Sequence, residues 1–123
     1  MKFRLNHISI PRPNKSDKAA RDFYGGLLKL EELPTPSELE FRQPIWYKLN
    51  ENRELHLYGE SEQSVKTNRH FCLEADNNLD QLLEKLINAG IKVWKPVAIP
   101  DRFRFFCEDP FCNVIEFIQF LEK

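Results

Sequence analysis

The chain has three histidines, and each lies in a stretch of alternating apolar residues that is typical of a β-strand. They are His7, His56 and His70. Glu116 lies in a fourth such stretch, 114–118, where burial of a carboxylate without a partner would be costly. Imidazole and carboxylate groups together suit Zn, Ni, Fe, Mn or Co, and two histidines with one carboxylate leave coordination positions open for a substrate. These four residues are therefore a candidate site for one divalent metal ion.

Side chains alternate between the two faces of a strand, which predicts the direction of three of these four groups. His56, His70 and Glu116 each alternate with a pair of apolar residues. The pairs are Leu55 and Leu57, Phe71 and Leu73, and Ile115 and Phe117. If the apolar pairs pack on helices, His56, His70 and Glu116 point to the opposite faces of their sheets.

For His7 the pattern is mixed, because Leu5 shares its face while Ile8 and Ile10 lie on the other. A single histidine in a strand is also more often a core or surface group than a ligand. Packing therefore remains the alternative interpretation for each histidine.

The elements that must carry these residues follow the same order in both halves of the chain. The pattern predicts strands at 2–10, 39–42, 45–49 and 53–58 with a helix through 19–28 in the first half. It predicts strands at 69–75, 91–94, 103–107 and 114–120 with a helix over 79–90 in the second half. Pro11 and Pro13 are expected to end the first strand, because proline cannot donate a hydrogen bond to a central ladder.

Each half is thus a βαβββ module, about 1–58 and about 69–123, joined by a polar linker at about 59–68. Together they predict one α+β domain over 1–123. One helix covers only one face of a four-stranded sheet. Two such mixed sheets side by side would form an open trough, which is a natural place for a small ligand.

Composition narrows the class of partner. Charged residues make up 30% of the chain but the net charge is −1, which argues against nucleic acid or an anionic membrane as partner. No apolar run approaches the roughly 18 residues of a spanning helix, and the first residues contain no signal-peptide core. The expected location is the cytoplasm. The chain has three cysteines, Cys72, Cys107 and Cys112, which is a small and odd number for a disulfide framework.

Six short segments, in their order and spacing, resemble the glyoxalase/bleomycin-resistance/extradiol-dioxygenase group, the vicinal oxygen chelate superfamily. The resemblance covers nearly the whole chain. The segments read NHISI (6–10), DFYGGLL (22–28), ELHL (54–57), RHF (69–71), LINAGI (86–91) and DPFCNVIEF (109–117). The resemblance implies a glyoxalase-like fold, a divalent metal ion and a homodimer.

By this resemblance His7, His70 and Glu116 fall on metal-ligand positions, and His56 falls on the ligand position of the fourth strand. In catalytic members the metal binds a small oxygen-rich substrate through neighbouring oxygens and stabilises a developing anion. The implied function is a metal-dependent lyase or isomerase, with His56 and Glu116 as catalytic residues. His56 is either a ligand or a base. The alternatives are an iron(II)-dependent dioxygenase and a non-catalytic binding protein of the bleomycin-resistance type.

The chain departs from the family pattern at three positions. Glyoxalase I-like members usually have glutamate where this chain has His56, so lactoylglutathione lyase activity is not expected. Cys112 and Lys29 stand where many members have glycine, and Cys112 is expected to be strained or to lie in a reshaped turn.

Five further residues are candidates for a substrate pocket. Arg102 and Arg104 share a strand face and could clamp an anionic substrate, although a solvated strand face is the alternative. Trp46, Tyr58 and Phe105 could form an apolar wall, with core packing as the alternative for each.

Overall fold

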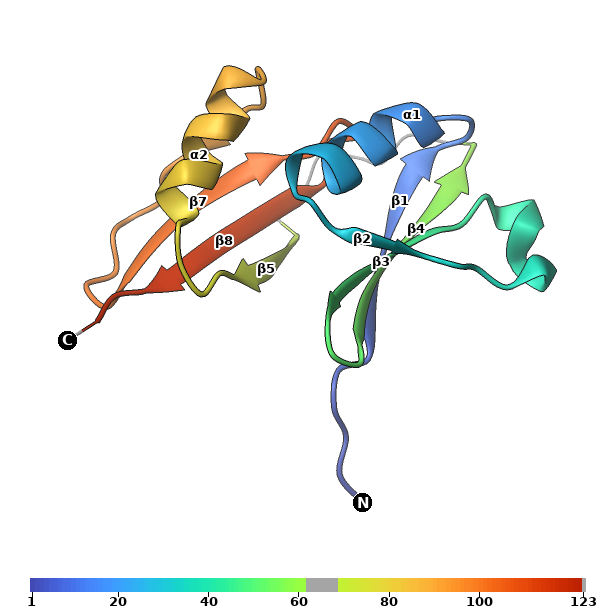
Figure 1. The fold of residues 1–123 in the computed structure, drawn as a ribbon, viewed down its shortest axis with the longest axis horizontal. Coiled ribbons are helices and arrows are strands. Elements are labelled where there is room, and N and C mark those ends of the chain that lie inside the picture. The colour runs from blue at the N-terminus through green and yellow to red at the C-terminus, as the bar shows by residue number, and fades with distance from the viewer. Residues whose placement is uncertain (62–68, 123) are drawn as a thin grey trace. The chain divides into compact units, whose positions relative to one another are not determined.

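The computed structural model describes residues 1–61 and 69–122 and shows two four-stranded mixed sheets with a few helices (Figure 1). The chain divides into two compact units, residues 1–64 and residues 65–123. The predicted α+β class is confirmed, because each unit combines one mixed sheet with helical segments. No helix among the described residues is long and apolar enough to cross a membrane.

The first unit contains a sheet with strand order β1-β4-β3-β2. Strands β1 and β4 are parallel, and the other neighbours are antiparallel. The helix α1 continues directly into a π-helical segment, η1, and a 3₁₀ helix, η2, precedes β3. The elements are β1 (His7–Pro13), α1 (Asp17–Ala20), η1 (Arg21–Leu27), β2 (Glu31–Leu33), η2 (Ser37–Arg42), β3 (Ile45–Asn50) and β4 (Arg53–Glu60).

The second unit repeats this topology with strand order β5-β8-β7-β6. Strands β5 and β8 are parallel, and β8-β7 and β7-β6 are antiparallel. The elements are β5 (His70–Glu74), α2 (Leu79–Asn88), β6 (Val93–Trp94), β7 (Arg102–Glu108) and β8 (Val114–Phe120). The repeated βαβββ order predicted from the sequence is therefore present.

Each sheet buries the apolar face that the alternation predicts. In the first unit Leu55 and Leu57 are fully buried with Tyr24 of the helical segment and Tyr47 of β3. In the second unit, the buried side chains of Phe105, Ile115 and Phe117 lie on one face of the sheet, and Leu86 of α2 is also fully buried. Burial of these apolar surfaces is the main stabilising contribution in each unit.

Strand β1 corrects the expectation that Pro11 and Pro13 end the first strand. The strand begins at His7, not at residue 2, and continues through both prolines to residue 13. β1 is the edge strand of its sheet. The backbone N–H of Asn14 donates to Glu60, so even-numbered residues of β1 face β4 and the odd-numbered proline nitrogens face the open edge, where no donor is needed.

The predicted strand at 39–42 is also wrong. Residues 37–42 form the 3₁₀ helix η2, preceded by Pro36 in an extended conformation and ended by Gln43, whose φ of 50° is left-handed. The edge strand lies earlier, at β2, where Glu31 and Leu33 pair with Lys48 and Trp46 of β3. A three-residue strand with two glutamates carries too short a pattern to be recognised in sequence.

Four positions favour glycine for reasons of space or backbone conformation. Gly59 lies within β4, which continues to Glu60, and a Cβ there would lie 2.6 Å from Asn14 Oδ1 and 3.1 Å from Gln43 Cβ. The rest of the predicted linker, 62–68, lies outside the described residues. Gly90, Lys29 and Cys112 have φ angles of 78°, 59° and 68°, so the positions where glycine was expected do adopt left-handed backbone.

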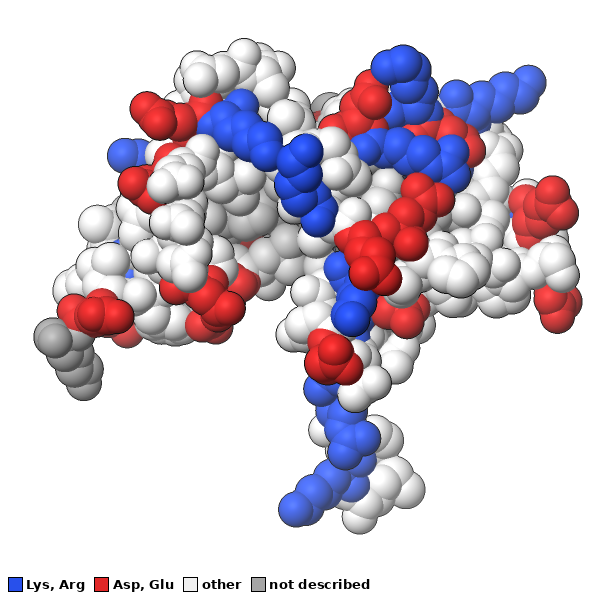
Figure 2. All heavy atoms as spheres, viewed as in Figure 1, with Lys and Arg blue, Asp and Glu red and all other residues white. Residues whose placement is uncertain are grey.

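Charges of both signs lie next to one another around α1 on the face drawn in Figure 2. Lys18 Nζ lies 2.7 Å from Asp22 Oδ2, and Arg21 Nε lies 2.9 Å from Glu32 Oε1. These pairs are exposed and each contributes little to stability.

Candidate metal-ligand residues

His7 and His56 lie together on one face of the first sheet. Their rings stack with centroids 4.1 Å apart and planes 16° apart. The parallel register pairs Ser9 of β1 with His56 of β4, so His7 is the diagonal neighbour of His56. This contact settles the side of β1 on which His7 lies, which the mixed sequence pattern left open.

His56 is held on both ring faces and by one hydrogen bond. Trp46 stacks on it at 3.9 Å with planes only 2° apart, opposite to it in the antiparallel register. His56 Nε2 lies 2.8 Å from Glu54 Oε1. Burial lowers the pKa of His56, and the hydrogen bond to Glu54 opposes this only in part. The neutral imidazole that results is the form that binds metal ions.

His70 and Glu116 form the corresponding pair in the second sheet. His70 Nε2 lies 3.2 Å from Glu116 Oε1. The parallel register pairs Cys72 of β5 with Glu116 of β8, so His70 is the diagonal neighbour of Glu116. Phe106 of β7 pairs with Glu116 and contacts the His70 ring edge-on at 5.0 Å.

The two pairs occupy equivalent positions in the two repeats. In each sheet the first candidate ligand is a histidine on the first strand. The residue two positions after this histidine pairs with the second candidate ligand on the neighbouring strand. The second candidate ligand pairs on its other side with an aromatic residue of the next strand. The equivalent positions are His7 and His70, Ser9 and Cys72, His56 and Glu116, and Trp46 and Phe106. The candidate ligands could be named from the sequence, whereas this register equivalence is visible only in the strand pairing.

Arg104 contacts Glu116 directly. Its Nη1 donates to Glu116 Oε2 at 3.0 Å, and its Nη2 donates to the carbonyl oxygen of Val97 at 2.7 Å. Arg102 lies on the same strand face, but it pairs with Asp101 at 2.8 Å and its guanidinium lies over Phe120. The two arginines thus share a face as expected, and only Arg104 touches a candidate ligand.

The aromatic candidates differ in their surroundings. Phe105 is fully buried beside Phe117, on the opposite face from Arg104, so its side chain belongs to the core. Phe106 instead lies on the Glu116 face and stacks on Trp94 at 5.6 Å. In the first sheet Tyr58 contacts the edge of His56 at 6.2 Å, and the Arg42 guanidinium lies 3.8 Å from its ring centre.

Two contributors, Glu54 and Phe106, were missed as functional candidates in the sequence. Strand alternation does place Glu54 on the face of His56 and Phe106 on the face of Arg104. That signal gives the face of a residue but not its partner, and their contacts depend on side-chain conformation.

The residues fit a divalent metal in chemical kind. Three imidazoles and one carboxylate form a donor set suited to Zn, Ni, Fe, Mn or Co. His56 Nδ1 is buried and has no hydrogen-bond partner among the residues that the structure describes, so this nitrogen makes no polar contact there. Within residues 1–61 and 69–122, no group of three or more His, Cys, Asp and Glu side chains is arranged to hold a metal, so the candidates are seen as two pairs.

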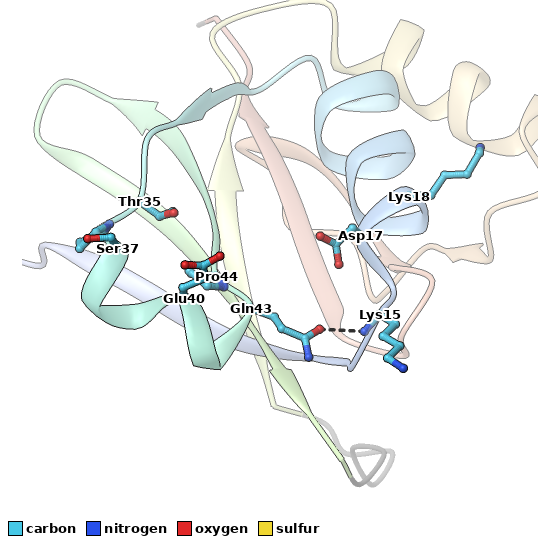
Figure 3. Close-up of a pocket in the computed structure, with 9 residues that line it drawn as sticks. Lys15, Asp17, Lys18, Thr35, Ser37, Glu40, Gln43 and Pro44 are labelled. Carbon is cyan, nitrogen blue, oxygen red and sulfur yellow. Dashed lines mark hydrogen bonds between the residues drawn. The ribbon is translucent and has the colours of Figure 1, made fainter.

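A separate groove of about 770 Å³ lies in the first unit between the start of α1 and η2 (Figure 3). Gln43 reaches across one end of it and accepts a hydrogen bond from the backbone N–H of Lys15 at 2.8 Å. Lys18, Asp17 and Glu40 also line it. None of the four candidate metal ligands does.

Comparison with known proteins places the chain among glyoxalase-like structures. A glyoxalase family protein from Bacillus anthracis matches with a TM-score of 0.87 and 32% identity over 98% of both chains. A glyoxalase/dioxygenase from Nostoc punctiforme matches with a TM-score of 0.80 and 22% identity, covering 97% of this chain and 92% of that one. The fosfomycin resistance protein FosX from Listeria monocytogenes matches with a TM-score of 0.77 and 13% identity, covering 98% and 96%.

No protein-family model and no curated protein matches the chain. The second and third structures share the fold with this chain. The first shares sequence as well, over almost its full length. The chain therefore belongs to the glyoxalase family, within the vicinal oxygen chelate superfamily.

Proposed function

We propose that the protein is a divalent-metal-dependent enzyme whose metal ligands are His7, His56, His70 and Glu116. The observation that carries this proposal is the register equivalence of the His7–His56 and His70–Glu116 pairs. A chance scatter of histidines would not place two donor pairs at the same positions of two repeated sheets. Superfamily members typically use a divalent metal, which supports the proposal.

The candidate ligands would contribute to metal binding in different ways. Neutral imidazoles donate nitrogen, and the carboxylate of Glu116 donates oxygen and offsets positive charge. Arg104 holds Glu116 Oε2, which leaves Oε1 as the oxygen free to coordinate once the contact with His70 is exchanged. A bound metal would supply Lewis-acid polarisation of substrate oxygens.

The proposed reaction class is that of a lyase or isomerase on a small oxygen-rich metabolite. Lactoylglutathione lyase activity is not part of the proposal, because His56 stands where glyoxalase I-like members have a carboxylate. We also propose a homodimer, which sedimentation at micromolar concentration tests. A monomer at that concentration would contradict it.

Calorimetric titration with Zn²⁺, Ni²⁺, Co²⁺, Mn²⁺ and, under anaerobic conditions, Fe²⁺ tests the ligand assignment. His7→Ala, His70→Ala and Glu116→Gln are each expected to weaken binding by more than the roughly 10–100-fold typical of an outer-shell residue. Glu84→Gln, an exposed position on α2, is the matched control and is expected to bind as the parent does. Parent-like affinity in Glu116→Gln would overturn the assignment of Glu116.

A second candidate function is a binding protein without chemistry. The observation in its favour is that Glu116 already contacts both Arg104 and His70, so its carboxylate is satisfied by the chain itself. If this candidate is right, neither the parent nor Glu116→Gln takes up metal, and Glu116→Gln differs from the parent only in stability.

A further inference from the structure

Glu54 is the hydrogen-bond partner of the His56 ring. Its Oε1 lies 2.8 Å from His56 Nε2, and an ionised carboxylate can only accept a hydrogen bond. His56 Nε2 must therefore carry the proton. In the neutral ring the lone pair then lies on Nδ1.

That lone pair has no partner among the described residues. His56 is 5% exposed, and its Nδ1 is buried without a hydrogen bond within the described part of the chain. A buried acceptor left unpaired loses its hydrogen bonds to water without compensation. The ring cannot readily turn to recover a bond, because His7 and Trp46 stack on its two faces at 4.1 and 3.9 Å.

We propose that Glu54 is a positioning residue that holds His56 in the Nε2–H tautomer and leaves Nδ1 as its metal-binding nitrogen. The assignment of Nδ1 as the metal-binding nitrogen rests on the proposed function, whereas the assignment of the tautomer does not. Glu54 lies two residues before His56, and His56 occupies the position where glyoxalase I-like members have a glutamate. The carboxylate of Glu54 acts on the ring of His56 instead of on the metal.

The second repeat has no carboxylate at the position that corresponds to Glu54, which is consistent with this assignment. Val114 occupies the register position that corresponds to Glu54. A carboxylate ligand has no tautomer to fix, and Glu116 is instead held by Arg104 at 3.0 Å. Each repeat thus provides its second candidate ligand with one charged residue that orients it.

Nitrogen-15 NMR of histidine-labelled protein without added metal tests the tautomer directly, at a pH above that of ordinary histidine titration. The parent is expected to show His56 with a protonated Nε2 and an unprotonated Nδ1. Glu54→Gln keeps an acceptor oxygen and should retain this pattern, whereas Glu54→Ala should shift the ring towards the Nδ1–H form. A protonated Nδ1 in the parent, or a Glu54→Ala spectrum equal to that of the parent, would overturn the proposal.

Metal titration of the same variants tests whether Nδ1 of His56 binds the metal. Glu54→Ala is expected to weaken binding by about 10–100-fold, with Glu54→Gln in between, and added Zn²⁺ should shift the Nδ1 resonance of the parent. Glu51→Gln is the control, because Glu51 lies in the adjacent turn with its side chain 90% exposed. Unchanged affinity in Glu54→Ala would refute the role of Glu54 at the metal. If the parent binds no metal, the proposed function fails, and the tautomer result still decides whether Glu54 positions His56.

Discussion

Cys112 holds a left-handed backbone, with a φ of 68°, in the turn between β7 and β8. A side chain with a Cβ costs about 1–2 kcal/mol there, and glycine does not, although glycine also makes the unfolded chain more flexible. We expect Cys112→Gly to raise the free energy of unfolding by about 0.5–1 kcal/mol, measured by urea denaturation. Cys112→Ser keeps the Cβ and should give no such gain. Equal stability of the two variants would contradict the assignment of strain.

Tyr47 makes stability depend on alkaline pH. Burial raises the pKa of its hydroxyl from 10.0 to about 12. The folded state therefore keeps a proton that the unfolded state loses, and the free energy of unfolding falls as the pH rises from 10 to about 12. Burial also raises the pKa of Cys107 from 9.0 to about 12, which adds a further loss that begins at a lower pH, near 9.

Tyr47→Phe separates these contributions. The Tyr47 hydroxyl is buried without a hydrogen-bond partner in the described residues, so its removal should raise the free energy of unfolding at neutral pH, by up to about 1–3 kcal/mol. Above pH 10 the variant should lose less stability than the parent, because the Tyr47 contribution is gone while those of the Cys107 and Cys72 thiols remain. Thermal unfolding at neutral and alkaline pH measures both. Parallel stability curves for variant and parent would be the contrary result.

Single residues also show how far the candidate site could be predicted from the sequence. Alternation with apolar pairs was sufficient to orient His56, His70 and Glu116, because in each strand the flanking apolar pair is more deeply buried than the candidate ligand. The side on which His7 lies needed the ring contact with His56. The contact of Arg104 with Glu116 joins residues on two different strands, and no local pattern reports which side chain a guanidinium reaches.

At the level of elements, Arg12 ties three segments of the first unit together. It is 1% exposed, and its Nη1 donates to Asp17 Oδ1 at 2.9 Å while its Nη2 donates to the carbonyl oxygen of Gln43 at 2.6 Å. It thereby joins the end of β1, the start of α1 and the end of η2. An arginine between two prolines is not recognisable in sequence as a buried clamp.

Arg12→Met should therefore lower the free energy of unfolding by about 2–4 kcal/mol, because it leaves the Gln43 carbonyl without its donor and loses the ion pair. Asp17→Asn should cost less, since the Asp17 side chain is 48% exposed. Denaturant unfolding of both variants gives the comparison. A larger loss in Asp17→Asn than in Arg12→Met would contradict the clamp.

Strong repeating patterns made most elements predictable, and short or exceptional ones failed. Strands β4 and β8 alternate over many residues and were found close to their true bounds. β2 is too short for a period, and the prolines of β1 are acceptable only because that strand lies at an edge, which the sequence does not specify.

At the level of the whole molecule, the chain carries two copies of one βαβββ unit with matched strand order. The repeat, the α+β class and the family could all be predicted from the sequence, because hydrophobic period and segment order reflect topology. The reaction could not, since one fold supports several chemistries and side-chain types do not specify a substrate.

The metal content of the purified protein decides whether this chain is a metal protein, as we propose. Elemental analysis would be applied to protein purified without chelators and then dialysed after exposure to Zn²⁺, Ni²⁺, Co²⁺, Mn²⁺ or Fe²⁺. We expect retention of about one ion per chain for at least one of these metals. Retention below about 0.2 ion per chain for every metal would contradict it.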